Sequence, residues 1–366
     1  CSANMVKPAI GPDSGSQADD YFNTVLWTGN ASSRSITGVG FQPDWVWFKP
    51  RSDADNHVLI DSSRGGTKYL MSNRTDAELT QDPGITAFGT DGFSIGNWTN
   101  INENNQTYVA WNWKANGGTA TASGSESGNT LAYSAQANTT AGFSIVTYTG
   151  NGADNADVTV NHGLGVTPRM VIVKNRTDAN RWQVYHEDLS ADGSYTKKNI
   201  LLNSTAAESG YSSQIKSVSS SAFVVRDVDS DGNANVNKNN SNYVAYCFAE
   251  IEGYSKFGSY IGNGAADGPF VFTGFKPAWV MIKNTARGAD WRINDITRQD
   301  RNNAGYSSAH LLAASSNSAE ITNEYDIDFL SNGFKLRSGD VYENGSGEAF
   351  IYMAFAEAPF KYSNAH

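Results

Sequence analysis

An acidic run in the second half of the sequence carries its sharpest chemical pattern. Asp227, Asp229, Asp231 and Asn233 stand at alternate positions, with a glycine just before the asparagine. Oxygen ligands at such offsets can converge on one hard cation, and a glycine permits the tight turn of a calcium loop. However, Lys238 takes the twelfth position, where a bidentate glutamate is expected. The run therefore favours a solvated, Asx-rich turn, and calcium is the one cofactor left open.

Three glutamates, Glu78, Glu208 and Glu320, recur at one position of a repeated pattern. Paired carboxylates hydrolyse glycosidic bonds. The alternative is a cap on a short helical turn, because a threonine or asparagine stands three residues before each glutamate. Three equivalent active sites in one chain are unusual, so the recurrence favours a structural role. The motifs of nucleophilic and phosphate chemistry are also absent from the sequence. We therefore expect no catalytic residues and no enzyme, with a glycan depolymerase as the third-ranked function.

A second repeated pattern pairs an aspartate with an arginine. Asp61 and Arg64 recur as Asp295 and Arg298, three positions apart in both places. An ion pair across a loop explains this spacing most simply. A glycan-binding site that is shared by the two regions is the alternative.

Trp98 and Trp182 stand in polar, loop-like surroundings. An exposed indole can pack on the apolar face of a sugar ring, which makes both residues candidates for ligand binding. The alternative is burial in a core or between modules, because each large ring can bury about 150–250 Å².

Three lysines, Lys49, Lys174 and Lys283, each end an apolar run. We expect them to extend over a sheet edge with their ammonium groups in water, or to block pairing at that edge.

The composition is that of a polar, acidic and folded chain. Aromatic residues make up 12% of it, too many for a disordered segment. The 35 glycines favour turns and short strands over long helices. A formal net charge of −10 disfavours nucleic-acid binding, which needs a basic face. Because no stretch of 18 apolar residues occurs, we expect no membrane insertion.

The positions that these residues occupy belong to a threefold internal repeat. In each copy a Gly-Asn pair follows an aromatic run, a proline then stands six positions before a lysine, and a second aromatic run closes the copy. The repeat predicts an upstream domain end or linker at 1–20, module 1 at 21–115, a Gly/Ser/Thr-rich linker at 116–141, module 2 at 142–252, module 3 at 253–361 and a C-terminal tail at 362–366.

Each module is predicted to be an antiparallel β-sandwich. Its runs are four to eight residues long, rich in β-branched and aromatic residues, and bounded by glycine, asparagine, aspartate or proline. The dipeptides Asp91-Gly92 and Asn332-Gly333 indicate hairpin turns. We therefore expect an all-β chain of three tandem sandwiches of jelly-roll or lectin-like type.

The runs that carry the repeat resemble a domain that is widespread in uncharacterised virion proteins of marine tailed phages. The resemblance rests on residues 21–113, 248–260, 329–337 and 353–362, so it covers nearly the whole chain. The first twelve residues are similar to the segment that follows a SPRY-type β-sandwich in such proteins, which implies a further upstream domain.

The resemblance implies an extracellular place in the virion, in a tail fibre or surface appendage, where adhesion to a host surface or glycan is the usual task. The partners it implies are other virion proteins, a host glycan and further copies of the chain. The alternative is a purely structural fibre or capsid-decoration module without a host ligand. An exposed aromatic patch would favour adhesion, whereas wholly buried aromatics would favour the structural role.

Overall fold

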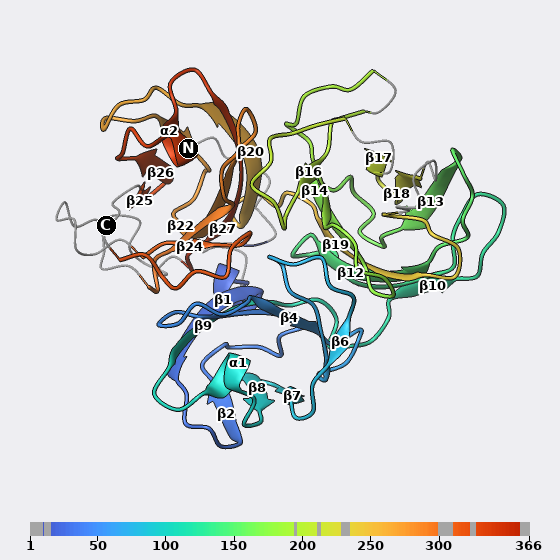
Figure 1. Cartoon of the computed structure of the whole chain (residues 1–366), viewed down its shortest axis with the longest axis horizontal. Coiled ribbons are helices and arrows are strands. Elements are labelled where there is room, and N and C mark those ends of the chain that lie inside the picture. Colours follow the sequence, from blue (N-terminus) through green and yellow to red (C-terminus); the bar gives the residue numbers. More distant parts are fainter. Residues whose placement is uncertain are drawn as a thin grey trace, which may run out of the picture.

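The computed structural model describes residue 10 and residues 16–193, 196–210, 214–227, 235–298, 310–322 and 327–358. Three lobes surround a common centre, and they are formed in chain order by modules 1, 2 and 3 (Figure 1). Strands pair antiparallel within every sheet. The prediction of an all-β fold of the sandwich type is confirmed. Among the described residues, no helix is long and apolar enough to cross a membrane.

Module 1 has two layers. Its large sheet has the order β1-β9-β3-β4 and its small sheet the order β2-β8-β7, while a separate hairpin joins β5 to β6. A 3-10 turn, η1, precedes the first strand, and the one-turn helix α1 precedes β9. The bounds are η1 (Ala18–Asp20), β1 (Phe22–Thr28), β2 (Arg34–Thr37), β3 (Trp45–Pro50), β4 (Val58–Asp61), β5 (Lys68–Tyr69), β6 (Leu79–Thr80), β7 (Ile85–Gly89), β8 (Gly92–Ile95), α1 (Thr99–Asn102) and β9 (Thr107–Trp113).

Modules 2 and 3 repeat this topology. The large sheets contain the orders β12-β19-β14-β15-β16 and β20-β27-β22-β23-β24, and the small sheets are β13-β18-β17 and β21-β26-β25. In module 2 the bounds are β12 (Phe143–Thr149), β13 (Asp157–Asn161), β14 (Met170–Asn175), β15 (Gln183–His186), β16 (Ile200–Leu201), β17 (Gln214–Val218), β18 (Ala222–Arg226) and β19 (Asn242–Phe248). In module 3 they are β20 (Ser255–Ile261), β21 (Phe270–Phe272), β22 (Pro277–Asn284), β23 (Arg292–Asp295), β24 (Leu312–Ala313), β25 (Ile327–Leu330), β26 (Gly333–Leu336), α2 (Val341–Asn344) and β27 (Ala349–Ala356).

The segment that composition predicts as a flexible linker instead forms part of module 2. Its strands β10 (Ala122–Gly124) and β11 (Tyr133–Asn138) extend the large sheet beyond β12. Ala135 and Ala137 point into the sandwich and are buried there. Small residues that alternate with serine, glutamine and asparagine give a weak strand signal, which explains why the sequence reads as a linker.

The recurring Gly-Asn pair marks a place where two backbones touch. A Cβ atom on Gly29, Gly150 or Gly262 would lie 2.0–2.3 Å from a carbonyl oxygen of the segment that precedes the last strand. The residue after each glycine donates its backbone N–H to a buried asparagine side chain, at 2.8–3.1 Å. The pairs are Asn30 with Asn102, Asn151 with Asn237, and Asn263 with Asn344. Only glycine permits this approach, so the motif closes each sandwich at one end.

In modules 1 and 2 the third strand of the large sheet is apolar on both faces because each face lies in a different core. In β3, Val46 and Phe48 fill the sandwich of module 1. Trp45 and Trp47 point to the opposite side and pack in a core that all three modules share. This alternation follows from the period of two along a strand.

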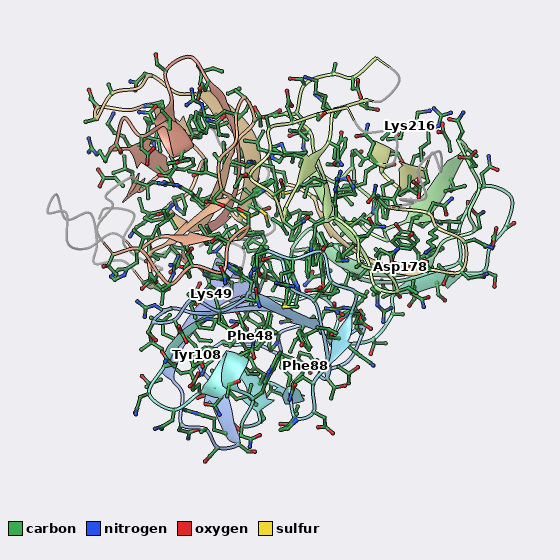
Figure 2. All side chains as sticks on the ribbon, in the orientation of Figure 1. Phe48, Lys49, Phe88, Tyr108, Asp178 and Lys216 are labelled. Atoms are coloured by element: carbon green, nitrogen blue, oxygen red, sulfur yellow. The ribbon has the colours of Figure 1, made fainter. Side chains whose placement is uncertain are left out.

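The shared core lies where the three large sheets face one another (Figures 1 and 2). The Trp45 ring stacks on Tyr246 of module 2 with a centroid distance of 4.2 Å. The Trp113 ring packs edge-on against Trp279 of module 3 at 5.7 Å. Phe248 of module 2 lies 6.1 Å from Phe355 of module 3. Each module thus contributes aromatic rings to one common interior.

Candidate functional site

The predicted pair Asp61 and Arg64 lies at the joint between modules 1 and 2. The Arg64 Nε atom donates to Asp61 Oδ2 at 2.5 Å, and the Tyr246 hydroxyl of module 2 donates to the same oxygen at 2.8 Å. Neither charged side chain has exposed surface. Burial alone would lower the pKa of Arg64, but the Asp61 carboxylate, Tyr246 and Glu78 outweigh it and raise that pKa. The guanidinium is therefore a permanent buried cation.

Asp295 and Arg298 repeat this arrangement at the joint between modules 3 and 1. Arg298 Nε donates to Asp295 Oδ2 at 2.5 Å, and the Trp111 indole of module 1 donates to that oxygen at 2.9 Å. Both charged side chains are again fully buried. The ion-pair interpretation describes both pairs, and a glycan has no exposed surface to contact at either of them.

The equivalent place at the joint between modules 2 and 3 has no such ion pair, because His186 and Leu189 stand there. Burial lowers the pKa of His186 to about 4, so its ring is neutral. Its Nδ1 atom accepts from the Asp188 N–H at 3.2 Å, which leaves Nε2 to donate to the Tyr352 carbonyl at 3.1 Å. One neutral hydrogen bond thus replaces the charged pair.

The recurring glutamates connect neighbouring modules. Glu78 accepts from Arg176 of module 2 at 2.8 and 2.9 Å, and from Arg64 at 3.0 Å. Burial would raise the pKa of Glu78, but its hydrogen bonds to Arg176 and the charge of Arg64 outweigh this effect and lower it. Neither a helical cap nor a pair of catalytic carboxylates describes this contact.

Glu320 and Glu208 take the corresponding places at the other two joints. Glu320 of module 3 accepts from Arg51 of module 1 at 2.8–3.0 Å. The backbone N–H of Glu208 donates to the Thr285 carbonyl of module 3 at 3.0 Å, and its carboxylate bonds Ser190 within its own module. The contacts therefore run in one cyclic direction, from each module to the next.

The three lysines are buried at the same joints, so the prediction of ammonium groups in water at a sheet edge is wrong. Lys174 Nζ donates to the Thr75 carbonyl of module 1 at 3.1 Å, and Lys283 Nζ donates to the Thr205 carbonyl of module 2 at 2.8 Å. Burial lowers the pKa of Lys49 and Lys283 to about 8 and that of Lys174 to about 7. Lys49 Nζ (labelled in Figure 2) donates to the Pro50 carbonyl of its own module at 2.6 Å, and the charges of Glu320 and Arg298 of module 3 act on its pKa.

The two tryptophans that were candidates for sugar stacking are also buried. The Trp182 indole donates to the Met71 carbonyl of module 1 at 2.9 Å and has no exposed surface. Trp98 is 9% exposed and packs on Tyr69 with a centroid distance of 4.6 Å. These contacts correspond to the packing alternative, and all nine tryptophans of the chain lie in cores.

Most of the candidate calcium loop lies outside the described residues, including Asp229, Asp231 and Asn233. Asp227 is described and buried, and its Oδ2 atom accepts from the Asn237 N–H at 2.9 Å. Within the described ranges, no group of three or more histidine, cysteine, aspartate or glutamate residues could hold a metal ion.

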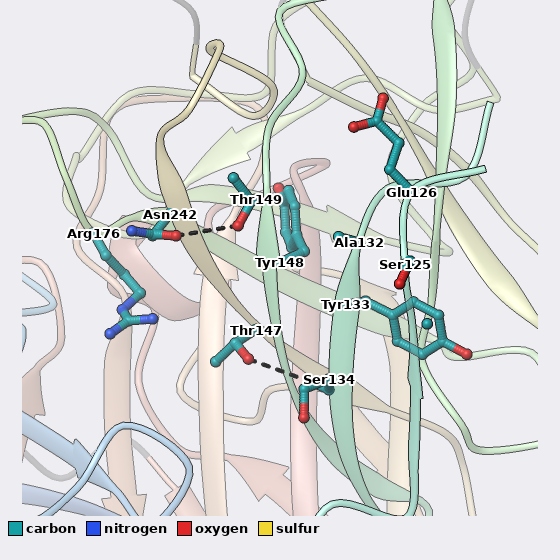
Figure 3. Close-up of a pocket in the computed structure, with 11 residues that line it drawn as sticks. Ser125, Glu126, Ala132, Tyr133, Ser134, Thr147, Tyr148, Thr149, Arg176 and Asn242 are labelled. Atoms are coloured by element: carbon teal, nitrogen blue, oxygen red, sulfur yellow. Dashed lines mark hydrogen bonds between the residues drawn. The ribbon is translucent and has the colours of Figure 1, made fainter. Parts of the chain in front are cut away.

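A polar groove of about 360 Å³ opens on module 2, at one end of its large sheet (Figure 3). The end of β10, the start of β11, the end of β12 and the start of β19 contribute to it. The residues that line it are Gly124, Ser125, Glu126, Ala132, Tyr133, Ser134, Thr147, Tyr148, Thr149, Arg176 and Asn242.

The groove combines one aromatic ring with several hydrogen-bonding groups. Part of Tyr133 packs against the core of module 2, and its ring borders the groove. A Cβ atom on Gly124 would lie 2.7 Å from this ring, so the glycine makes room for it. Thr149 and Asn242 bond each other at 3.2 Å across neighbouring strands. An aromatic face beside hydroxyl, amide and guanidinium groups is suited to a sugar or another small polar ligand.

Sequence reasoning missed this groove because its residues come from the supposed linker, from β12 and β19, and from the loop after β14. Tyr133 stands alone among small residues in the sequence. Only the pairing of Tyr133 with Tyr148 in the register of β11 and β12 brings the lining residues together. The isolated aromatic residue in a Gly/Ser/Thr-rich segment was the one available signal.

A family model described as "Domain of unknown function (DUF7483)" matches residues 17–359, and the chain belongs to this family. The match spans all three modules, so the unit that defines the family is the three-module block. No curated protein and no solved structure matches the chain.

Proposed function

We propose that this chain is a non-enzymatic structural module of a phage virion appendage, such as a tail fibre, in which three sandwiches act as one rigid block. The observation that carries the proposal is the shared core. Domains of one chain move relative to each other by default, unless the interface between them is large and apolar. Here the interface is an aromatic interior to which every module contributes.

The buried polar contacts at the joints support rigidity in the same way. Each joint buries groups that must stay paired, because an unpaired charge in a dry interior costs several kcal/mol. Sliding one module past another would break the contact of Arg176 with Glu78 and that of Arg51 with Glu320. A block of this kind holds its shape under load, which is what a fibre or a shell decoration needs.

The virion assignment is supported by the resemblance of residues 21–113, 248–260, 329–337 and 353–362 to phage proteins. The net charge of −10 suits a protein that is displayed in many copies and must not aggregate. Burial of all nine tryptophans favours the structural role over adhesion through an aromatic surface patch.

Glycan adhesion is the second candidate function, and the groove on module 2 favours it. Tyr133 offers a ring face, while Asn242, Ser134 and Thr147 offer hydrogen bonds. Glu126 is the one carboxylate among the lining residues, whereas glycosidases use a pair. The groove is therefore suited to binding rather than to hydrolysis, and we propose no cofactor for it.

Immunogold labelling of phage particles that encode the chain tests the structural assignment. Antibodies against the purified chain should label an external appendage of the intact particle. Label that appears only in infected cells, and never on particles, would contradict the proposal.

A glycan array with the purified chain, with and without calcium, tests the second candidate. Binding that Tyr133→Ala abolishes, while Tyr342→Ala on module 3 leaves it unchanged, would establish the groove as an adhesion site. A folded chain that binds no glycan would remove adhesion and leave the structural role. Binding that is lost when calcium is removed would point to the run from Asp227 to Asn233 instead.

A further inference from the structure

Strand β21 of module 3 presents two exposed phenylalanines on one face. Phe270 is 44% exposed and Phe272 is 63% exposed, while Val271 between them is buried in the core. The strand lies at the edge of its sheet, which has the order β21-β26-β25. The unpaired N–H and C=O groups of an edge strand form a ready template for pairing with another strand, above all where the strand is exposed and apolar.

The equivalent strands of the other two modules show that the fold does not need these rings. The registers with β8, β18 and β26 align Phe270 with Ser35 and Thr159. The same registers align Phe272 with Thr37 and Asn161, so both outward positions are polar in modules 1 and 2. The Phe270 ring lies over Gly333, 2.9 Å from where a Cβ of that glycine would stand. This packing gives the Phe270 ring a role within its own sheet. Among the described glycines, Phe272 has no contact this close, since its ring lies 3.8 Å from where a Cβ of Gly274 would stand.

The backbone of β21 is arranged to accept a strand. Thr273 donates its N–H to Asn332 of the neighbouring turn at 3.0 Å. Because hydrogen-bonded and non-hydrogen-bonded positions alternate in an antiparallel ladder, Val271 also bonds inward. The N–H and C=O groups of Phe270 and Phe272 therefore point away from β26. In the described part of the chain, no segment pairs with this edge.

Module 2 shows that this edge of the fold can pair with a further backbone segment, which runs parallel to it there. Thr159, the counterpart of Phe270, donates its N–H to the Asn129 carbonyl at 2.7 Å. Its own carbonyl accepts from the Leu131 N–H at 2.9 Å. The chain itself thus covers the edge of β13, with Thr130 bridged to Thr159.

We propose that β21 pairs with β21 of a second copy of this chain, antiparallel and about a two-fold axis at Val271. This register places Phe270 opposite Phe272 of the partner subunit. Both residues have outward backbone groups, so each opposed pair can exchange its two hydrogen bonds. The strand carries no charge and is its own complement, as an isologous contact requires. Among the described strands, β21 is the one edge with two exposed phenylalanines, so assembly through it stops at the dimer.

Sedimentation equilibrium of the full chain, from low to high micromolar concentration, tests the proposal. The wild-type chain should show a monomer–dimer equilibrium. Phe272→Thr gives module 3 the residue of module 1 and keeps Phe270 over Gly333, so the fold should persist, as circular dichroism can verify. We expect this variant to weaken dimerisation by at least about tenfold. Thr37→Ala, at the matched position in β2, should leave the equilibrium unchanged.

Amide hydrogen exchange then distinguishes strand pairing from a loose apolar contact. Phe270 and Phe272 amides should be protected at high concentration and exposed at low concentration. A chain that stays monomeric at every concentration would overturn the proposal and leave the edge to a strand of another protein. A dimer that Phe272→Thr and the double variant Phe270→Ser/Phe272→Thr both leave intact would overturn it as well.

Discussion

At the joint between modules 1 and 2, Arg64 lies buried between Asp61 and Glu78, whereas at the joint between modules 2 and 3 Leu189 takes the place of the arginine. Both joints nevertheless keep the same backbone contacts to the next module. Glu78 donates its N–H to the Arg176 carbonyl at 2.8 Å, and Glu208 donates to the Thr285 carbonyl at 3.0 Å. Equivalent geometry is thus reached with and without the buried arginine–aspartate pair.

This comparison separates what holds the modules together from what the charges contribute. Buried ion pairs often contribute little relative to apolar residues of similar volume, but removing one partner is strongly destabilising. The apolar interior is therefore the main source of cohesion, as the joint without an arginine–carboxylate pair shows. At two of the three joints the buried ion pairs add specificity. If the modules packed in another way, a charge would stay buried and unpaired.

The largest expected effect comes from removing one partner of the buried Asp61–Arg64 ion pair. Arg64→Met leaves Asp61 buried without its cation, and we expect it to lower the free energy of unfolding by about 3–5 kcal/mol. Urea unfolding of the purified variant measures this loss. The double variant Asp61→His/Arg64→Leu carries the residues of module 2 and should recover most of it. A double variant that is less stable than Arg64→Met would refute the equivalence of the joints.

The glutamates give a second contrast between the joints. Glu78→Gln weakens charge-assisted hydrogen bonds to two arginines, so we expect a loss of about 1.5–3 kcal/mol. Glu208→Gln affects only Ser190 and Lys198, whose ammonium lies 3.6 Å away on a partly exposed side chain. That loss should be below about 1 kcal/mol. Equal losses in the two variants would argue against a distinct role for the inter-module arginine.

The buried lysines predict a pH dependence that runs opposite to that of a salt-bridged lysine. The pKa of Lys174 is about 7 in the folded chain and near 10.5 when unfolded. Between these values the unfolded chain binds more protons, so stability rises with pH by up to about 1.4 kcal/mol per unit from this group. Lys174→Met should flatten the rise between about pH 7 and 9, whereas Lys238→Met on the surface should not. Unfolding midpoints across this range provide the measurement, and an unchanged slope in Lys174→Met would contradict the prediction.

An exposed ion pair should show the smallest effect. Arg74 and Asp76 bond each other at the surface, with side chains 52% and 37% exposed. Arg74→Ala should change the free energy of unfolding by less than about 0.5 kcal/mol, because solvent screens the pair. Thermal unfolding beside Arg64→Met, under the same conditions, compares the two environments. A loss close to that of Arg64→Met would remove the distinction between buried and exposed pairs.

The sequence predicted the class of fold because short runs of β-branched and aromatic residues, bounded by turn residues, indicate strands directly. The Asp91-Gly92 turn corresponds to the hairpin of β7 and β8, and each Gly-Asn pair corresponds to a close approach of two backbone segments. The sequence could not show that the two apolar faces of a strand such as β3 pack in two different cores. Trp45 and Val46 look alike as buried residues, and only the packing of three large sheets separates their surroundings.

The candidate sites illustrate the same limit. Asp61, Arg64 and Trp182 were noticed because polar or aromatic residues in such places can bind ligands. In the fold these residues lie at the joints between modules, which a pattern along one chain does not reveal. The groove around Tyr133 depends on strand register and on a segment whose composition resembles a linker. Its residues carry no shared motif.

Differential scanning calorimetry of the full chain tests most directly whether the three modules form one unit. We predict a single unfolding transition with a calorimetric enthalpy equal to the van't Hoff enthalpy. In Arg64→Met the whole transition should shift to lower temperature without splitting. Two or three separate transitions in the wild-type chain, or an Arg64→Met variant in which only module 1 melts early, would contradict the account.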